Sequence, residues 1–352
     1  MIKEKINIMT QMIKKNINDI MIKFLPLLSF IIPFLVLYSL YPNSFEPVWT
    51  GTWKNRTGYI FFLWLLSLET ILSWEELRTE KCKLKSKKNI AFIIAFLLPT
   101  IYVIISNYFG LNTLIINLAK QYNIKPAWAA LMPLSTEYLV FAVLFASIII
   151  LEHGRSGLKV YSICTFLLVI IGAIYTIDNI YPFGEFTPFQ IIVPPTATLA
   201  ANVLNLMGYK TFLDTRGAMP YLFAKNPEGS FGALIAWPCS GVESLLIYTM
   251  TILLFLKKSA IPLKLKIIYF IIGAIVTYFI NILRIVTIFV IAISKGDWGI
   301  FHDYYGPLYS LTWIISYPLI IIGSQALLSK IRNWKTETKD VSNLLNQTRR
   351  PS

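Results

Sequence analysis

The chain alternates between long hydrophobic runs and short polar segments along nearly its whole length. Apolar runs close to the roughly 20 residues that a helix needs to cross a bilayer occur eight times, at 24–41, 58–75, 90–109, 134–151, 158–177, 242–256, 266–293 and 309–328. Backbone groups inside lipid must satisfy their own hydrogen bonds, and helices do so within one segment. The pattern therefore predicts an all-α polytopic membrane protein, a bundle of about eight transmembrane helices.

The long segment between the fifth and sixth runs has structure of its own. Residues 194–208 predict a short helix that ends at Gly208. Two apolar and aromatic runs within 221–237 flank an Asn-Pro-Glu-Gly sequence, which predicts a hairpin that ends beside Cys239. We therefore expect a small extracytoplasmic helix and hairpin insertion over residues 181–238.

The placement of basic residues predicts the orientation of the bundle. The chain is 56% hydrophobic and carries a net charge of +14, which would suggest nucleic acid only if the protein were soluble. If both termini are cytoplasmic, 23 of the 32 Lys and Arg residues lie on the cytoplasmic side, as the positive-inside rule requires. We therefore expect a multi-pass cell-membrane protein with the segments 178–238 and 294–308 outside, and no nucleic-acid partner.

The two ends of the chain are polar. Residues 1–23 carry lysines on a partly amphipathic pattern without a cleavage site, which predicts an uncleaved cytoplasmic or surface-lying segment. Residues 335–352 predict a polar cytoplasmic tail without regular structure. The expected division is a membrane domain over 1–334 followed by this tail.

Few residues are available for metal or redox chemistry. Cys82, Cys164 and Cys239 are far apart and odd in number, which argues against a disulfide framework and a zinc pattern. The two histidines, His153 and His302, exclude a multi-histidine metal site within one chain. No phosphate-binding loop is present. We expect neither a metal nor a cofactor.

Cys239 lies at the outer start of the sixth run, within a Pro-Cys-Ser-Gly sequence that leads into it. The free N–H groups and dipole of a helix N-terminus favour a thiolate. The N–H groups near Ser240 and Gly241 could form an oxyanion hole, and the glycine would let a substrate approach the backbone. The alternative is a cysteine that only packs, which is the expected role of Cys164. Cys82 is expected to be an idle exposed thiol.

Arg284 lies inside the seventh run, where an arginine is costly and usually functional. Its alternative role is a structural ion pair, for which Glu243, four residues after Cys239, is the expected partner. Asn281 lies one turn before Arg284 and could orient its side chain. His302 precedes the last run and would be the one imidazole on the outer side.

Three patterns resemble the exosortase/archaeosortase family of membrane transpeptidases. They are Pro-Cys-Ser-Gly around Cys239, Asn-Ile-Leu-Arg-Ile around Arg284, and His-Asp-Tyr-Tyr-Gly from His302 onward. The resemblance is specific over 231–325, the expected catalytic core, and weak before it. It implies that Cys239 is the nucleophile and that Arg284 and His302 complete the site. The expected supporting residues are Ser240, Gly241, Glu243, Asn281 and Gly306.

The resemblance also implies a reaction. The partners would be membrane-anchored proteins with a C-terminal sorting signal, namely a short motif, a transmembrane helix and a basic end. The enzyme would cut them through a Cys239 thioester and transfer them to a lipid or surface-polymer acceptor. A cysteine-dependent membrane acyltransferase that modifies lipids, a scaffold and a transporter are the alternatives. A transporter should show broken helices in two related halves, and the sequence has no such repeat.

Overall fold

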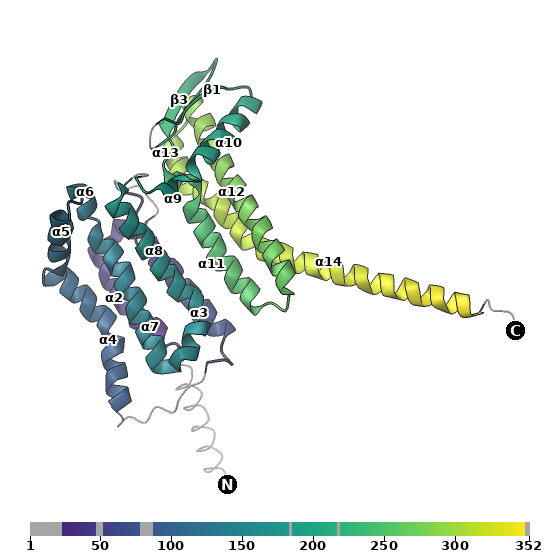
Figure 1. Cartoon of the computed structure of the whole chain (residues 1–352), viewed down its shortest axis with the longest axis horizontal. Helices are drawn as coiled ribbons and strands as arrows, with labels where there is room; N and C mark the ends of the chain where they lie inside the picture. Colours follow the sequence, from purple (N-terminus) through teal and green to yellow (C-terminus); the bar gives the residue numbers. More distant parts are fainter. Residues whose placement is uncertain (1–22, 47–51, 78–86, 183–184, 217–218, 349–352) are drawn as a thin grey trace, which may run out of the picture.

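The computed structural model describes residues 23–46, 52–77, 87–182, 185–216 and 219–348. Helices make up most of this part, and its strands form one small sheet at one end of the molecule (Figure 1). The predicted all-α polytopic architecture is confirmed. Cys82 and all of the predicted N-terminal segment except Lys23 lie outside the described residues.

The N-terminal half is a helical bundle packed around aromatic side chains. Its long helices are α2 (Leu25–Leu40), α3 (Thr57–Leu72), α4 (Lys87–Tyr108), α7 (Met132–Val160) and α8 (Ser162–Ile180). Many rings in its core meet edge to face, the arrangement that aromatic quadrupoles favour. Phe30 makes such contacts with Phe62, Phe141 and Phe145.

Two glycines interrupt the helices of this bundle. Gly110, with φ of +79°, separates α4 from the shorter α5 (Leu111–Gln121), and the two helices are bent by 68°. Gly154, with φ of +69°, lies inside α7 where the sequence predicts a loop. Left-handed backbone is open to glycine because no Cβ collides, so α7 resumes after this break and ends at Val160. The short α6 (Pro126–Ala129) precedes α7.

The C-terminal half contains three further long helices. They are α11 (Val242–Lys258), α12 (Leu263–Ile293) and α14 (Gly306–Thr348), with α13 (Trp298–Ile300) and the π-helical turn η4 (Phe301–Tyr305) between the last two. The far end of α14 extends away from the bundle (Figure 1). The predicted polar tail therefore begins inside a helix that continues to Thr348, and its expected lack of regular structure is wrong.

A compact tier of short elements covers the upper end of the C-terminal half (Figure 1). It contains α9 (Thr187–Gln190), α10 (Val193–Leu206) and an antiparallel sheet of β1 (Lys210–Asp214), β2 (Tyr221–Asn226) and β3 (Gly229–Leu234) in that order. The predicted helix and hairpin are present, and β1 was not predicted. Small and apolar side chains join the tier to α12, among them Ala197, Ala200, Leu222, Ala224 and Phe289.

Helices occupy all eight of the predicted apolar runs. Within the described part, five helices are long and apolar enough to cross a membrane, and six if the bent pair α4 and α5 is one span. The helices α2, α3 and α11 are shorter, with 16, 16 and 17 residues. One of these five is the segment Thr187–Leu206, formed by α9 and α10, which the sequence places in the extracytoplasmic insertion rather than in a span.

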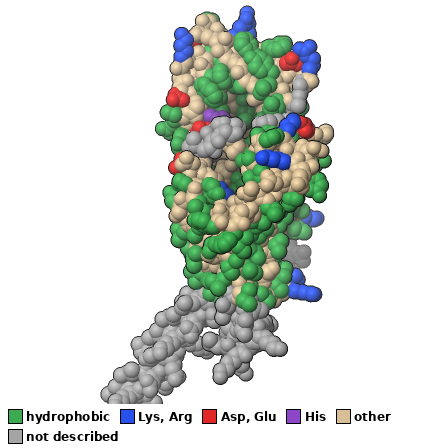
Figure 2. Space-filling view, turned by 90° about the vertical axis from the view of Figure 1, so that its left-hand side faces the viewer, with side chains coloured by type: hydrophobic (Ala, Val, Ile, Leu, Met, Phe, Trp, Pro, Cys, Tyr) green, Lys and Arg blue, Asp and Glu red, His purple; other side chains and the backbone are tan. Residues whose placement is uncertain are grey.

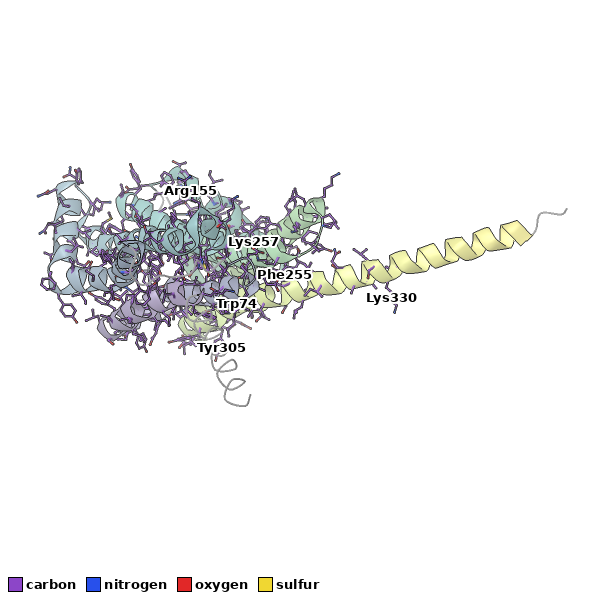
Figure 3. The ribbon with its side chains drawn as sticks, turned by 90° about the horizontal axis from the view of Figure 1, so that it is seen from below. Trp74, Arg155, Phe255, Lys257, Tyr305 and Lys330 are labelled. Atoms are coloured by element: carbon purple, nitrogen blue, oxygen red, sulfur yellow. The ribbon has the colours of Figure 1, made fainter. Side chains whose placement is uncertain are left out.

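Hydrophobic side chains cover much of the lateral surface, whereas charged side chains gather around the upper tier (Figure 2). At the opposite end, seen in Figure 3, Lys257 of α11 reaches the N-terminal bundle. Its Nζ donates to the carbonyl of Val160 at 2.7 Å and pairs with Glu69 at 3.3 Å. The same Glu69 carboxylate accepts from the backbone N–H of Cys164 at 3.1 Å, so this contact joins the two halves.

A buried ion pair lies at the other end of the N-terminal bundle, between Arg56, just before α3, and Glu137 of α7. Arg56 holds both carboxylate oxygens of Glu137 through Nε at 2.8 Å and Nη2 at 3.0 Å. Tyr59 donates to the same carboxylate at 2.8 Å. A planar guanidinium and a carboxylate match each other in this two-bond geometry. Both charges are therefore satisfied away from water.

We expect Arg56→Ala to destabilise the protein strongly. The variant leaves the buried Glu137 charge without its partner, a loss of about 3–5 kcal/mol for buried pairs. The measurement is the thermal unfolding midpoint of the purified protein in detergent. Lys125→Ala is the control because Lys125 and Glu185 form an exposed pair, which should leave the midpoint unchanged. Equal midpoints for both variants would contradict a stabilising role of the Arg56 pair.

Candidate active site

Cys239 lies on the tight turn that joins the sheet to α11. This turn, η3 (Trp237–Ser240), is a single 3-10 turn that follows β3. Ser240 Oγ donates to the carbonyl of Trp237 at 2.6 Å, and Ser240 is 0% exposed. The serine hydroxyl therefore closes the turn, while the Cys239 side chain remains half-buried.

Gly241 and Asn281 hold this turn against α12. Gly241 has φ of +96°, and a Cβ there would lie 3.0 Å from Asn281 Cγ, so both conformation and space require glycine. Asn281 Nδ2 donates to the carbonyl of Cys239 at 3.0 Å. The space that the sequence interpretation assigned to a substrate is thus filled by Asn281. The asparagine hydrogen-bonds to the cysteine turn rather than to Arg284.

Arg284 connects α12 to the beginning of α14. Its Nη2 donates to the carbonyl of His302 at 2.8 Å. A Cβ at Gly306 would lie 2.5 Å from Arg284 Nε, so the glycine leaves room for the guanidinium. Within the described part, Nε is buried without a hydrogen-bond partner. Among the described residues no contact within 4 Å joins Arg284 to the alternative partner Glu243, although the two charges attract each other at longer range.

His302 is oriented by a residue that the sequence analysis missed. Its Nδ1 lies 2.8 Å from Asp303 Oδ1. A carboxylate that accepts from Nδ1–H leaves Nε2 as the nitrogen able to take up a proton. The available signal was the acidic residue directly after the histidine in the sequence, and both residues lie in the π-helical turn η4.

The structure also bears on Cys164 and on the possible metal ligands. Cys164 is 0% exposed in the core of the N-terminal bundle, as expected for a cysteine that packs. Among the residues that the structure describes, no three His, Cys, Asp or Glu side chains gather in a way that could hold a metal ion.

Two opposing effects act on the Cys239 thiol. Burial raises its pKa, and the positive charge of Arg284 lowers it, with the effect of burial larger. The helix N-terminus was expected to favour the thiolate, but Cys239 precedes α11 and the pKa of its thiol is raised rather than lowered. A neutral thiol becomes a nucleophile only when a base removes its proton.

A sequence model of the transmembrane exosortase family matches residues 49–317. The match covers most of the chain and includes η3, the upper part of α12 and η4, which carry the candidate site. No curated protein and no solved structure matches the chain.

We expect alkylation of Cys239 to report its raised pKa. In a Cys82→Ala, Cys164→Ala background, the rate of N-ethylmaleimide labelling should rise about tenfold per pH unit below the pKa, because the thiolate reacts. The midpoint should lie above that of a free thiol and rise further in Arg284→Ala, which removes the favourable charge.

Arg216→Ala is the control for this measurement, because Arg216 pairs with Asp214 on the exposed sheet. Its midpoint should equal that of the parent protein. A midpoint below the free-thiol value, or one that Arg284→Ala leaves unchanged, would show that burial and Arg284 do not govern the thiol.

Proposed function

The chain belongs to the transmembrane exosortase family, and we propose that it is a cysteine transpeptidase that processes C-terminal sorting signals. Its substrates are membrane-anchored surface proteins that end in a short motif, one transmembrane helix and a basic segment. One observation carries the proposal. Arg284 binds the main chain of His302 and acts electrostatically on Cys239, so the three motifs meet in one place.

The first step is attack by Cys239 on the scissile carbonyl. His302 Nε2 takes the thiol proton, and the thiolate sulfur forms a bond to the carbonyl carbon. Asp303 accepts from Nδ1–H at 2.8 Å and stabilises the imidazolium that results. A base assists this step because burial raises the pKa of the Cys239 thiol.

Arg284 stabilises the negative charge that develops on the carbonyl oxygen. Its Nη2 is engaged by the His302 carbonyl, and the rest of the guanidinium provides a fixed positive charge near the sulfur. A charge held in place before the reaction costs no reorganisation in the transition state. Collapse of the tetrahedral intermediate breaks the C–N bond, and the imidazolium gives its proton to the leaving amine.

The second half of the reaction transfers the substrate. An amine or hydroxyl of a lipid or surface polymer loses its proton to His302 and attacks the thioester carbon. The sulfur leaves as thiolate and regains the proton. If water takes the place of the acceptor, the same residues carry out hydrolysis.

The site faces the outside of the cell membrane in this proposal, and both termini are cytoplasmic. The support comes from the basic residues. Arg155 of α7, Lys257 of α11 and Lys330 of α14, labelled in Figure 3, belong to the segments that the charge distribution predicts to be cytoplasmic. An excess of such residues is typical of cytoplasmic segments.

We expect Cys239→Ala and Cys239→Ser to abolish processing of a co-expressed surface protein that carries its C-terminal signal. The alanine removes the nucleophile, and a serine hydroxyl is far less acidic than a thiol. Gel mobility of the substrate is the readout, and Cys164→Ala is the matched control. Normal processing by Cys239→Ala would refute the thioester mechanism. Loss of lipid modification with intact peptide processing would instead favour an acyltransferase.

Arg284 and His302 should fail in different ways. His302→Ala should lose about 10²–10⁴ in rate, the usual contribution of a general base, and Asp303→Asn should lose less because the imidazole remains. Arg284→Ala should lose about 10²–10³, as for an oxyanion donor. Arg284→Lys should also be severely impaired because ammonium has a different reach and lacks the planar fork.

Processing in these variants is normalised to the folded enzyme in the membrane. Near-normal processing by a well-expressed Arg284→Ala enzyme would assign Arg284 a structural role. An Asp303→Asn enzyme that matches wild type at every pH would show that the carboxylate does not orient His302.

A further inference from the structure

A buried carboxylate at the outer end of α8 accepts hydrogen bonds from both halves of the molecule. Asp178 is 0% exposed, and its Oδ2 forms an ion pair with Lys54 Nζ at 2.8 Å. Trp53 Nε1 donates to the same oxygen at 3.2 Å. Trp237 Nε1 donates to the other oxygen, Oδ1, at 2.8 Å.

Trp237 is the first residue of η3 and lies two residues before Cys239. It is 1% exposed, with the ring of Trp53 at 4.5 Å on an edge-to-face contact and the ring of Phe189 at 4.6 Å. Its carbonyl accepts from Ser240 Oγ at 2.6 Å. The indole is therefore held by Asp178 at its N–H and by Ser240 through its own main chain.

These contacts leave the cysteine turn little freedom. Asn281 holds the Cys239 carbonyl from α12, and Asp178 holds the start of the turn from α8 through Trp237. We infer that Asp178 is a positioning residue, which acts through the Trp237 indole to place the Cys239 sulfur relative to Arg284 and His302. This inference rests on the proposed role of Cys239 as the nucleophile.

Only an ionised carboxylate suits this position. All three partners, the lysine ammonium and two indole N–H groups, are donors with nothing to accept. An asparagine amide would present an N–H₂ group to at least one of them. A buried ion pair gives little net stability compared with an apolar replacement, so its value lies in the geometry that it imposes on the turn.

A matched pair of variants separates positioning from stability. Trp237→Phe and Trp53→Phe each keep an aromatic ring and each remove one indole N–H from the same carboxylate. Only Trp237 belongs to the turn that carries Cys239. Both are made in the Cys82→Ala, Cys164→Ala background, so that N-ethylmaleimide labels Cys239 alone.

The first measurement is the pH midpoint of Cys239 labelling in the full-length protein, together with its thermal midpoint. Trp237→Phe should shift the labelling midpoint because the sulfur changes its distance from Arg284. Trp53→Phe should leave that midpoint unchanged at a similar loss of thermal stability. Asp178→Asn changes the acceptor of the same Trp237 hydrogen bond. It should therefore shift the labelling midpoint in the same direction as Trp237→Phe.

The second measurement is substrate processing per folded enzyme. Trp237→Phe should lose about 10²-fold, the effect of a misplacement of about 1 Å, whereas Trp53→Phe should stay within about threefold of its parent. Equal losses in the two variants, with both labelling midpoints unchanged, would overturn the inference. Failure of the proposed function is distinguishable, because Cys239→Ala would then process normally while the labelling midpoints still report where the thiol lies.

Discussion

The need to satisfy an arginine inside an apolar helix governs the arrangement of the C-terminal half. A guanidinium taken out of water must find acceptors or opposing charge. Arg284 finds the main-chain carbonyl of His302 at 2.8 Å, in the π-helical turn η4 that leads into α14. Gly306 completes the arrangement, since any larger residue would displace the guanidinium. The arginine thus fixes how α12, η4 and α14 meet.

The contacts made by α12 give a structural reason for the spacing of the three motifs around Cys239, Arg284 and His302. Gly241 and Gly306 lie beside Asn281 and Arg284, and each glycine makes room for one of these polar side chains of α12. Asn281 and Arg284 lie three residues apart, on one face of the helix. One side chain therefore reaches the cysteine turn, and the other reaches the histidine turn. The glycines maintain the distance between the backbones.

Much of the fold follows from the hydrophobic pattern. All eight apolar runs are helical because a hydrophobic segment of that length has few other ways to satisfy its backbone in lipid. The helix at 193–206 and the hairpin after it were also predictable, from the glycine stop and the Asn-Pro-Glu-Gly turn. The strand β1 was not, because Lys210–Asp214 shows little alternation and is a strand only through its pairing with β2. The continuation of α14 to Thr348 was missed because a polar sequence favours neither state strongly.

Some features of the candidate site could also be predicted from the sequence, and others could not. The motifs point to residues that the fold brings into one region, since Arg284 of α12 contacts His302 and Asn281 of the same helix contacts the Cys239 turn. The partners of those residues could not be predicted, because they depend on tertiary contacts that no local spacing encodes. Asp303 is the exception, because it directly follows His302 in the sequence. The main-chain carbonyl that Arg284 binds could not be predicted from the motifs. Asp178 and Trp237 are 59 residues apart, so neither one predicts the other.

The electrostatic state of Cys239 follows from the same contacts. Hydrogen bonds and packing that hold the turn firmly also exclude water from it, and exclusion of water disfavours a thiolate. Arg284 offsets part of this cost but not all of it. A thiol with a raised pKa becomes a strong nucleophile only when a base takes its proton. The contacts that hold the Cys239 turn in place and the burial that raises the pKa of its thiol therefore have one physical origin.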